Sequence, residues 1–388
     1  MLAVLLLAYA TATALEVPSE LLQKRRPIDR AFRVGDRQSW DIAVHGGDYI
    51  QVVVEQHNID MVATVADPGG QTVAMFDTPN GDLGPEHIRF IALVPGRYRI
   101  ELWAGQLEAE PGRYSIQLLE RRPATETDRR TVAAIAEQTE ADRLRSNPTT
   151  RADSLERYDR AIALWRDAGD RTGEAGALRA KGLAYMRLGK NENAYAVFLR
   201  TRRLWREAKD VRSEAFALLT LGTIHTRRNE PLETRSKALE ALPLWRRAGD
   251  REEEAFTLGE IGTTCARMKD RAATERWYRD ALAVARKTGR PTLEAAILDN
   301  FARAHALLND ASAALATHER ARVAWQRGHH RRGEAGSLRS MAAIHEARGD
   351  KAKAIDMYLR AADVWRQAGV EPEEAADRAR AEKLRTRS

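Results

Sequence analysis

The chain has 388 residues, of which 31% are charged and 43% are hydrophobic. This length suggests two or three domains, and this balance is typical of soluble globular or helical-repeat proteins, so a polytopic membrane protein and a disordered chain are excluded. A single Cys excludes an intramolecular disulfide and a cysteine-based metal cluster. The formal net charge is +7, but only ten of the 63 basic residues are Lys. Because this Arg excess is also what codon bias produces, the charge indicates little about partners.

The N-terminus carries a short apolar segment. Residues 2–14 contain no charge and end in Ala12-Thr13-Ala14, a pattern after which signal peptidase cuts. The segment is too short to span a bilayer comfortably. We therefore expect residues 1–14 to be a signal peptide, and the mature chain, without a membrane span, to be periplasmic or secreted. No basic residue precedes Lys24, so a hydrophobic tail on a cytoplasmic protein is the alternative.

The charge is divided unevenly along the chain. Residues 1–123 hold 12 basic and 16 acidic residues and are net negative, whereas residues 124–388 carry a net charge of +11. The two parts are therefore expected to be different bodies.

The first part has the pattern of an all-β domain. Between Ala31 and Glu120, apolar residues alternate with polar ones in short segments bounded by Gly, Pro, Asp and Asn, which predicts strands with one buried face. Turn sequences lie at 67–70 and 79–82, and Pro-Gly-Arg-Tyr precedes a strand at 95–98 and again at 111–114. About seven or eight such strands without a helical pattern predict an antiparallel β-sandwich over residues 30–122. The clearest strands are at 39–44, 49–54, 61–65 and 88–92.

This segment resembles the bacterial pre-peptidase C-terminal β-sandwich, through GGDYIQVVVEQ at 46–56, VADPGGQTVAMFDTPNG at 65–81 and the two Pro-Gly-Arg-Tyr strands. The resemblance implies a non-catalytic appendage of the kind found on secreted enzymes, some of which bind calcium. Asp67, Asp77, Asp82 and Glu86 have suitable oxygens but lack the spacing of a calcium loop. We expect them to be solvated turn carboxylates.

The second part is a repeat. Leu164-Trp165-Arg166 recurs every 40 residues, and a Glu-Ala pair follows nine positions after each Trp, first as Glu174-Ala175. Within each unit apolar residues recur at three and four positions, which predicts two helices, for example 171–188 and 191–207. We predict a helical linker over 124–150 and an all-α solenoid of about 40-residue repeats over 151–388. The later copies of the Trp segment are at 204–206, 244–246, 284–286, 324–326 and 364–366.

Loop residues support these boundaries. Gly169-Asp170, Gly249-Asp250 and Gly349-Asp350 place Gly where a helix ends in the left-handed conformation and Asp where it caps the next helix. Pro243 does not fit, because a Pro ring inside a helix clashes with the preceding turn. A kink or an early end of that helix is expected.

The array resembles tetratricopeptide (TPR) repeats of an extended class. Leu178, Gly182 and Tyr185 match the first-helix signature, and Ala194 and Phe198 match the second. The resemblance implies a right-handed solenoid whose groove, lined by the first helices, binds peptides or helices. The Trp residues are expected to fill the core. Ala285, which replaces Trp in one repeat, is expected to leave that repeat loosely packed.

Chemistry-bearing motifs are scarce in the sequence. It contains no G-x-S-x-G elbow, no H-E-x-x-H and no phosphate-binding loop. Cys265 occupies the same repeat position as His225, His305 and His345, and we expect a buried core thiol. One His per repeat places the rings about 10 Å apart, too far to share an ion with bonds of about 2 Å. We therefore expect no catalytic residue, no metal site and no cofactor.

One set of residues suggests a binding role. In the TPR pattern, Arg187, Arg227 and Arg267 face the groove in three successive repeats, and such guanidinium groups could grip an acidic peptide or a C-terminal carboxylate. A solvated basic face is the alternative. Nucleic acid is not expected, because no basic stripe is interleaved with aromatic residues. Neighbouring groove positions hold Arg179, Arg303 and Arg339.

The order of signal peptide, pre-peptidase-like sandwich and TPR array resembles the non-catalytic front portion of bacterial CHAT-domain proteins, in which a caspase-like domain follows. Two hypotheses result. The chain is a non-enzymatic scaffold that binds a partner protein or peptide in its groove. Alternatively, it is the regulatory part of a CHAT-type peptidase system whose catalytic domain is absent from this chain.

Overall fold

The structure is a computed structural model that describes residues 20–23, 26–33, 35–57, 59–76, 83–104 and 112–386. The predicted signal peptide, the turn at 79–82, Asp77 and Asp82 lie outside these residues. The chain divides into two compact units between Ala177 and Leu178. We call them the N-terminal and C-terminal units.

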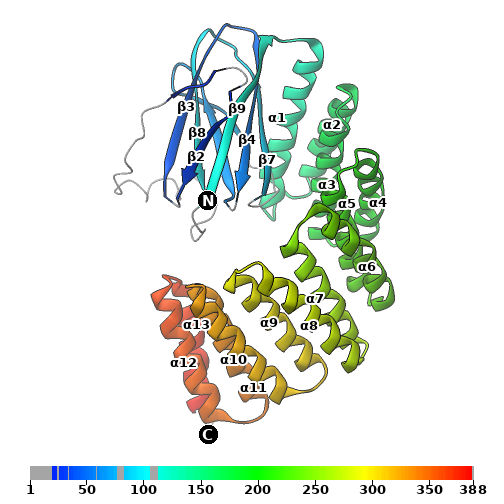
Figure 1. The fold of residues 1–388 in the computed structure, drawn as a ribbon, viewed down its shortest axis with the longest axis vertical. Helices are drawn as coiled ribbons and strands as arrows, with labels where there is room; N and C mark the ends of the chain where they lie inside the picture. The colour runs from blue at the N-terminus through cyan, green and yellow to red at the C-terminus, as the bar shows by residue number, and fades with distance from the viewer. Residues whose placement is uncertain are drawn as a thin grey trace. The chain divides into compact units, whose positions relative to one another are not determined.

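Two β-sheets make up the first part of the N-terminal unit (Figure 1). A five-stranded sheet has the order β1-β3-β8-β5-β6 and a four-stranded sheet has the order β2-β9-β4-β7. Strands β1 and β3 are parallel, and the other pairs are antiparallel. The strands are β1 Glu20–Leu21, β2 Ile28–Phe32, β3 Arg37–Val44, β4 Asp48–His57, β5 Met61–Ala66, β6 Thr72–Phe76, β7 Leu83–Ile91, β8 Gly96–Ala104 and β9 Gly112–Pro123. The predicted β-rich N-terminal region is therefore confirmed.

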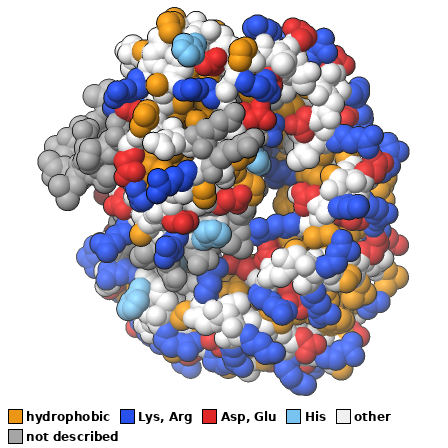
Figure 2. Space-filling view, turned by 45° about the horizontal axis from the view of Figure 1, so that its top comes forward, with side chains coloured by type: hydrophobic (Ala, Val, Ile, Leu, Met, Phe, Trp, Pro, Cys, Tyr) orange, Lys and Arg blue, Asp and Glu red, His pale blue; other side chains and the backbone are white. Residues whose placement is uncertain are grey.

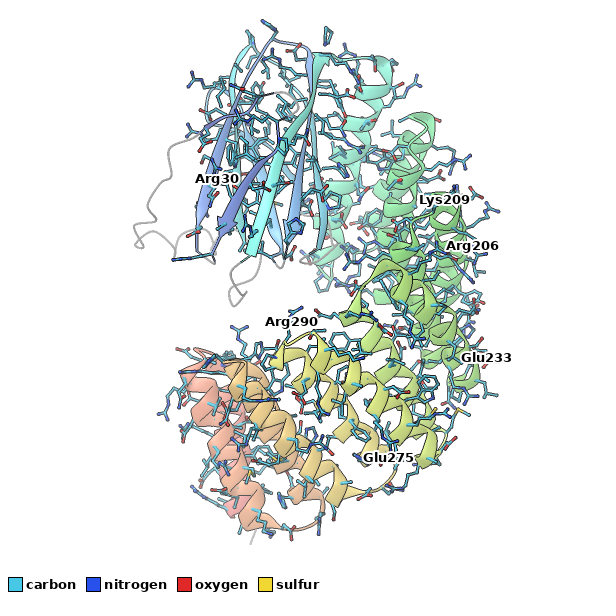
Figure 3. The ribbon with its side chains drawn as sticks, viewed as in Figure 1. Arg30, Arg206, Lys209, Glu233, Glu275 and Arg290 are labelled. Carbon is cyan, nitrogen blue, oxygen red and sulfur yellow. The ribbon has the colours of Figure 1, made fainter. Side chains whose placement is uncertain are left out.

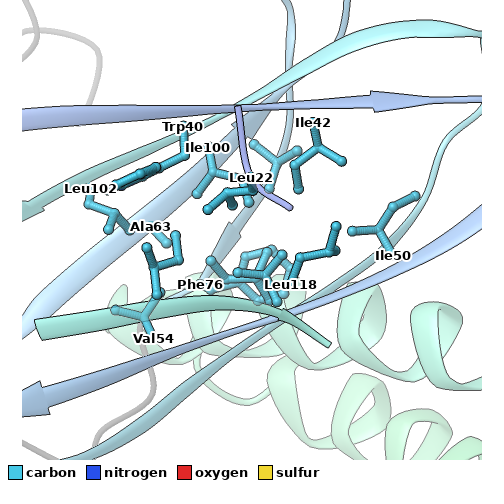
Figure 4. Close-up of a cluster of buried hydrophobic side chains, with 14 of the residues drawn as sticks. Leu22, Trp40, Ile42, Ile50, Val54, Ala63, Phe76, Ile100, Leu102 and Leu118 are labelled. Carbon is cyan, nitrogen blue, oxygen red and sulfur yellow. The ribbon is translucent and has the colours of Figure 1, made fainter. Parts of the chain in front are cut away.

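One hydrophobic cluster lies between the two sheets (Figure 4). Period-two alternation turns one side of each strand inward, so Trp40 and Ile100 of one sheet meet Val54 and Leu118 of the other. The Trp40 indole N–H donates to the Tyr114 hydroxyl at 3.1 Å. This bond satisfies the one polar atom that the indole brings into the core.

Two of the four candidate carboxylates are described, and they differ. Asp67 accepts backbone hydrogen bonds from Gly69 and Gln71, both at 2.9 Å, as a turn carboxylate should. Glu86 is only 1% exposed, so the expectation that it is a solvated turn residue is wrong. It lies within β7 on the side of Ile88, which is buried, and the Gln56 side-chain amide donates to it at 3.4 Å.

Thirteen helices follow in the described part of the chain, with bounds that repeat closely. They are α1 Glu126–Ser146, α2 Ser154–Asp167, α3 Arg171–Arg187, α4 Asn191–Glu207, α5 Val211–Arg227, α6 Pro231–Ala248, α7 Arg251–Arg267, α8 Arg271–Lys287, α9 Pro291–Leu307, α10 Ala311–Arg327, α11 Arg331–Ala347, α12 Lys351–Gln367 and α13 Glu371–Thr386. From α3 to α12 they alternate between A helices, which have odd numbers, and B helices, which have even numbers. Each A helix begins 40 residues after the one before it.

The first helix is anchored to the sheets. In the N-terminal unit α1 packs against β7, and Ile135 contacts the core between the sheets. Thr125 and Asp128 form a capping box at its start, and Asp128 also pairs with Arg122 at 2.5 Å. The Arg122 hydrogen bond lowers the pKa of Asp128 to about 2. The charged form of Asp128 therefore holds the junction between β9 and α1.

The interhelical loops share one backbone conformation. From Gly169 to Gly369, every twentieth residue has a φ between 52° and 79°, the left-handed region. Gly occupies six of these eleven positions; the other five are Lys209, Asn229, Lys269, Asn309 and His329. A following Asp often caps the next helix: Asp170 accepts from the Gly173 N–H at 2.8 Å and Asp250 from the Glu253 N–H at 3.1 Å. Asp350 makes no such bond to α12.

The predicted early end at Pro243 is wrong. Helix α6 continues through Pro243 to Ala248. Pro243 is exposed, and the residue four positions earlier, Leu239, is 42% exposed. The carbonyl that loses its helical partner therefore lies on the side of α6 where water can replace it.

The Trp positions are core positions, as predicted: Trp165, Trp205, Trp245 and Trp365 are buried. A Cβ added to Gly173 would lie 2.4 Å from the Trp165 ring, so this Trp needs Gly eight positions later. The same relation holds between Trp325 and Gly333, at 2.3 Å.

The repeat with Ala285 is not loosely packed, which corrects the expectation. Eight positions after Ala285 stands Leu293, which is 3% exposed and belongs to the same buried cluster. A large residue on the following A helix thus accompanies the small residue on the B helix, the reverse of the Trp165 and Gly173 arrangement.

The recurring Glu has a structural role. Except at Gln326, the residue that follows the Trp position is Arg, and it reaches the Glu at the fourth position of the next A helix, as in Arg206–Glu214 and Arg246–Glu254, both at 2.7 Å. Burial alone would raise the pKa of Glu254, but hydrogen bonds from Arg246 and Arg251 outweigh it and lower the pKa. These ion pairs tie consecutive hairpins together.

Candidate functional site

The A helices of the C-terminal unit lie side by side. Arg212 of α5 pairs with Asp250, the cap of α7, at 2.6 Å. The side chain of Ile297 on α9 would contact a Cβ at Gly259 on α7. We call one side of these helices the A-face. Its side chains are half-buried or exposed, and they are Arg179, Leu183, Arg187, Phe216, Leu219, Thr223, Arg227, Phe256, Glu260, Thr263, Arg267, Asn300, Arg303 and Arg339.

The three Arg residues of the predicted row stand at equivalent places. Arg187, Arg227 and Arg267 are the last residues of α3, α5 and α7, and all are exposed. The carbonyl groups at a helix C-terminus carry partial negative charge, so a guanidinium there stabilises its own helix. This local role is available to each of the three without any partner.

Arg227 also joins two repeats. Its Nη1 donates to the backbone carbonyl of Met186 at 2.8 Å and to the Asn191 side-chain oxygen at 3.3 Å. Because Met186 directly precedes Arg187, these bonds place the Arg227 guanidinium at the end of α3. Among the described residues, neither Arg187 nor Arg267 has a hydrogen bond or ion pair.

The other three predicted Arg residues do not share one environment. The Arg179 guanidinium lies over the Phe216 ring, 5.4 Å from its centroid. Arg303 donates to the side chain of Asn300 on its own helix. Arg339 binds both Asp377 oxygens, at 2.7 and 2.9 Å, and lies over the Trp365 ring. Arg339 therefore joins α11 to α13.

Sequence reasoning missed the acidic residues of α7. The pKa of Glu260 is raised to about 7, chiefly by burial; the Arg267 charge lowers it and the Glu253 charge raises it. Burial, Asp250 and Glu252 likewise raise the pKa of Glu253 to about 7. No hydrogen bond or ion pair reaches either carboxylate from the described residues. A comparison of the repeats could have revealed Glu260, because the other A helices carry a neutral residue at its position.

An aromatic ring stands at the same A-face position of α5 and α7. Phe216 of α5 and Phe256 of α7 occupy one repeat position, and both are half-buried. The corresponding residues of α3, α9 and α11 are Gly176, Ala296 and Gly336. At this position α5 and α7 therefore carry an aromatic ring, and their neighbours carry Gly or Ala.

Charged side chains also lie outside the A-face. On the face drawn in Figure 2, Lys and Arg side chains are interspersed with Asp and Glu rather than gathered into one block. Figure 3 shows that Arg206, Lys209 and Glu233 come from B helices or the loop after one, not from the A-face.

The remaining polar candidates lie inside. Cys265 is fully buried, as predicted, and burial raises the pKa of its thiol. His225 and His345 each bond a nearby carboxylate, Glu230 at 2.6 Å and Asp350 at 3.2 Å. In the described ranges, no three His, Cys, Asp or Glu side chains are grouped to hold a metal ion. None of the helices described has both the length and the apolar character needed to cross a bilayer.

Comparisons with known proteins give distant structural likenesses. No protein-family model matches the chain, and no curated protein matches it. The chain is similar to a signal transduction ATPase with a tetratricopeptide repeat sensor from Pyrococcus horikoshii, at 19% identity and a TM-score of 0.40, over 63% of this chain and 43% of that one. It is similar to aspartyl phosphate phosphatase F from Bacillus subtilis, at 11% identity and a TM-score of 0.46, over 67% and 72%.

A third likeness concerns the sheets. The pre-peptidase C-terminal domain of collagenase from Bacillus anthracis matches at 18% identity and a TM-score of 0.22, over 26% of this chain and 98% of that one. The chain's own strands and the constant spacing of its helices show a β-rich N-terminal region followed by a TPR-like helical repeat.

Proposed function

We propose that the C-terminal unit binds a protein or peptide partner on the A-face and that the chain acts as a non-enzymatic scaffold. The observation that carries this proposal is the pair Phe216 and Phe256, half-buried at one repeat position of α5 and α7, with the Arg179 guanidinium over the Phe216 ring. Aromatic and Arg side chains are the residues that dominate the energetics of protein interfaces. Stacked helices hold them rigidly, which lowers the entropy cost of binding.

The charge of the A-face supports an acidic partner. Arg187 and Arg267 are exposed, and only Arg267 has an acidic group of the A-face, Glu260, acting on it. Arg227 holds its guanidinium between repeats and adds positive charge near Arg187. A carboxylate on the partner could then bind at the C-terminal end of α3, which carries Arg187 and holds the Arg227 guanidinium at the Met186 carbonyl.

The test begins by selecting displayed 12-residue peptides on the full chain and measuring their affinity. The double variant Phe216→Ala and Phe256→Ala is expected to weaken binding by about tenfold or more, because central aromatic residues act as hot spots. Arg187→Glu with Arg267→Glu should weaken acidic peptides most. The matched controls are Leu199→Ala and Arg247→Glu, at exposed positions of B helices. Wild-type affinity in both A-face variants, with unchanged circular dichroism, would contradict the proposal.

A narrower role in a CHAT-type peptidase system is proposed as the second candidate. The observation that favours it is the order of the two regions, sheets first and helical repeats after them. An adjacent reading frame that encodes a caspase-like domain, and co-purification of its product with this chain, would support this role. If the neighbouring frames encode no such domain, the general scaffold is favoured.

An extracytoplasmic location remains a proposal based on residues 2–14. Fractionation of the source cells, with N-terminal sequencing of the mature protein, tests it. Cleavage after Ala14 is expected, and an intact N-terminus in the cytoplasmic fraction would contradict it.

A further inference from the structure

Variation between repeats separates structural from binding positions. The fourth and fifth residues of the A helices α3 to α11 are Glu and Ala, and the eighth is Leu. The ion pairs and buried contacts of these residues explain why they recur. Some A-face positions, that of Glu260 among them, differ from helix to helix. Where an A-face side chain differs from those at the same position of the other repeats, we look for its role in binding.

Glu260 is such a departure. The tenth residue of the A helix is Ala180, Thr220, Asn300 or Ser340 in the other repeats, and all are neutral. On α7 it is a carboxylate in a half-buried position that receives no hydrogen bond or ion pair from the residues described. Taking a carboxylate out of water without a partner destabilises the protein, and replacement by a neutral residue would remove this cost.

The surroundings of Glu260 suit one kind of ligand. Phe256 lies one helical turn before it on the same side of α7, and Phe216 lies on the neighbouring α5. A cationic side chain has an apolar stem and a charged head, so its stem can pack on aromatic surface while its head reaches a carboxylate. The basic ends of α3, α5 and α7 would repel a ligand that is basic throughout.

We propose that the partner bound by the A-face presents a single Lys or Arg side chain to Glu260, flanked by apolar residues that pack on Phe216 and Phe256, and carries acidic residues elsewhere. This inference rests on the proposed function and specifies the partner. The ligand is thus a mixed-charge segment, complementary to an acidic centre on α7 and basic helix ends around it.

The charged groups around Glu260 give this recognition a pH dependence. On α7 these groups are Glu253, which raises the pKa of Glu260, and Arg267, which lowers it. Arg212 of α5 acts on Glu253, and Arg303 of α9 and Glu260 both act on Tyr278 of α8. Because a cation binds the ionised carboxylate, affinity should rise as the pH increases from 6 to 8 and Glu260 loses its proton.

The test uses the full chain and one fluorescent 12-residue peptide selected on it by display at pH 8. We expect the selected sequences to share one basic position between apolar residues. Glu260→Gln should weaken the peptide about tenfold, the effect of removing one member of a partly buried charge pair. Replacing the basic residue of the peptide by norleucine should give the same loss, and the two changes together should be no worse than either. Glu233→Gln, an exposed carboxylate of α6, is the matched control and should leave the affinity unchanged.

The possible results distinguish failure of this inference from failure of the proposed function. Peptides that depend on Phe216 and Phe256 but show no basic position, or losses that simply add, would overturn this inference and leave the proposed function standing. A selection in which no peptide depends on the A-face would overturn both. If Glu260→Gln does not fold, Glu260→Asp takes its place: it keeps the charge on a shorter side chain and should weaken binding of the same peptide. The pH dependence of peptide affinity can be measured on the wild-type chain alone.

Discussion

The β-sheets and the helical repeats bury their apolar residues in different ways. Between the sheets there is one cluster, to which strands far apart in the sequence contribute. In the C-terminal unit the buried residues fall into several clusters, each made by neighbouring helices. A core assembled from distant segments is lost as a whole, whereas stacked hairpins depend mainly on their immediate neighbours. The two units should therefore respond differently to the same kind of damage.

The largest expected effect is at Trp40, which is 2% exposed in the sheet core. Trp40→Ala should destabilise the β-sheets by about 3–5 kcal/mol, because it leaves a cavity and removes the bond to Tyr114. Hydrogen exchange measured by mass spectrometry should then rise throughout β2 to β9. Trp365→Ala is the comparison, and its effect should be confined to α11, α12 and α13. Exchange that rises only in β3 and its neighbours would show that the sheets do not share one cooperative core.

The next effect concerns complementary sizes in the repeats. Ala285→Trp alone should destabilise the C-terminal unit by about 1–3 kcal/mol, since the ring would enter a cluster that Leu293 already fills. Adding Leu293→Gly creates the pairing seen at Trp165 and Gly173, and most of that loss should be recovered. Urea unfolding of the single and double variants measures the coupling. Additive losses would mean that the two positions are independent.

The charged groups should give the two units opposite responses to pH. Asp128 of the N-terminal unit has a pKa of about 2, below its ordinary 3.8, so its contribution is present above about pH 4 and is lost as the pH falls to about 2. Asp128→Asn should cost about 1 kcal/mol at neutral pH, through the cap and the Arg122 bond, and little at pH 2. Thermal unfolding as a function of pH checks this, and an equal loss at both pH values would contradict it.

Glu260 behaves in the reverse sense. Its pKa is raised from 4.5 to about 7, so the folded state holds the proton more tightly than the unfolded chain and stability falls as the pH rises between these values. Glu260→Gln should therefore make the C-terminal unit more stable at pH 8 and change little at pH 4. Melting temperatures at the two pH values measure the difference. A loss of stability at pH 8 would show that the ionised carboxylate has a partner within the chain.

The smallest effect is in the loops. Lys269 has a φ of 62°, a conformation that is unfavourable for a residue with a Cβ. Lys269→Gly should stabilise the C-terminal unit by about 0.5–1 kcal/mol. Gly249→Ala, at the equivalent loop position with a φ of 71°, should cost a similar amount. Chemical denaturation of both variants provides the measurement, and a loss in Lys269→Gly would mean that its side chain contributes more than its backbone costs.

Much of the fold could be predicted from local patterns. Period-two alternation located strands such as β3 and β4, and the recurring Trp and Glu-Ala positions located the helices. The burial of Glu86 was not predicted, because a strand pattern does not indicate that a charged residue lies on the buried side of β7. The predicted helix end at Pro243 was wrong because the effect of the Pro depends on whether water reaches the freed carbonyl. The predicted loose packing at Ala285 was wrong because Leu293 on another helix fills the space.

The candidate site was harder to predict than the fold. The row of Arg187, Arg227 and Arg267 follows from the repeat, but the bonds of Arg227 to Met186 and of Arg339 to Asp377 join residues about 40 positions apart. No rule of spacing gives such side-chain partners. Glu260 was overlooked because its burial and lack of a described partner appear only when neighbouring helices are in place.

The uniform loops give the hairpins equivalent connections. Asp210 caps α5 through the Ser213 N–H, and Asp250 caps α7 in the same way through Glu253. Excising residues 211–250 would join Asp210 to Arg251 and recreate an identical connection. An array built like this can be lengthened or shortened by whole modules through duplication or loss of 120 nucleotides with the loop conformation and the helix cap kept, so only the side chains that meet across the new junction need to change.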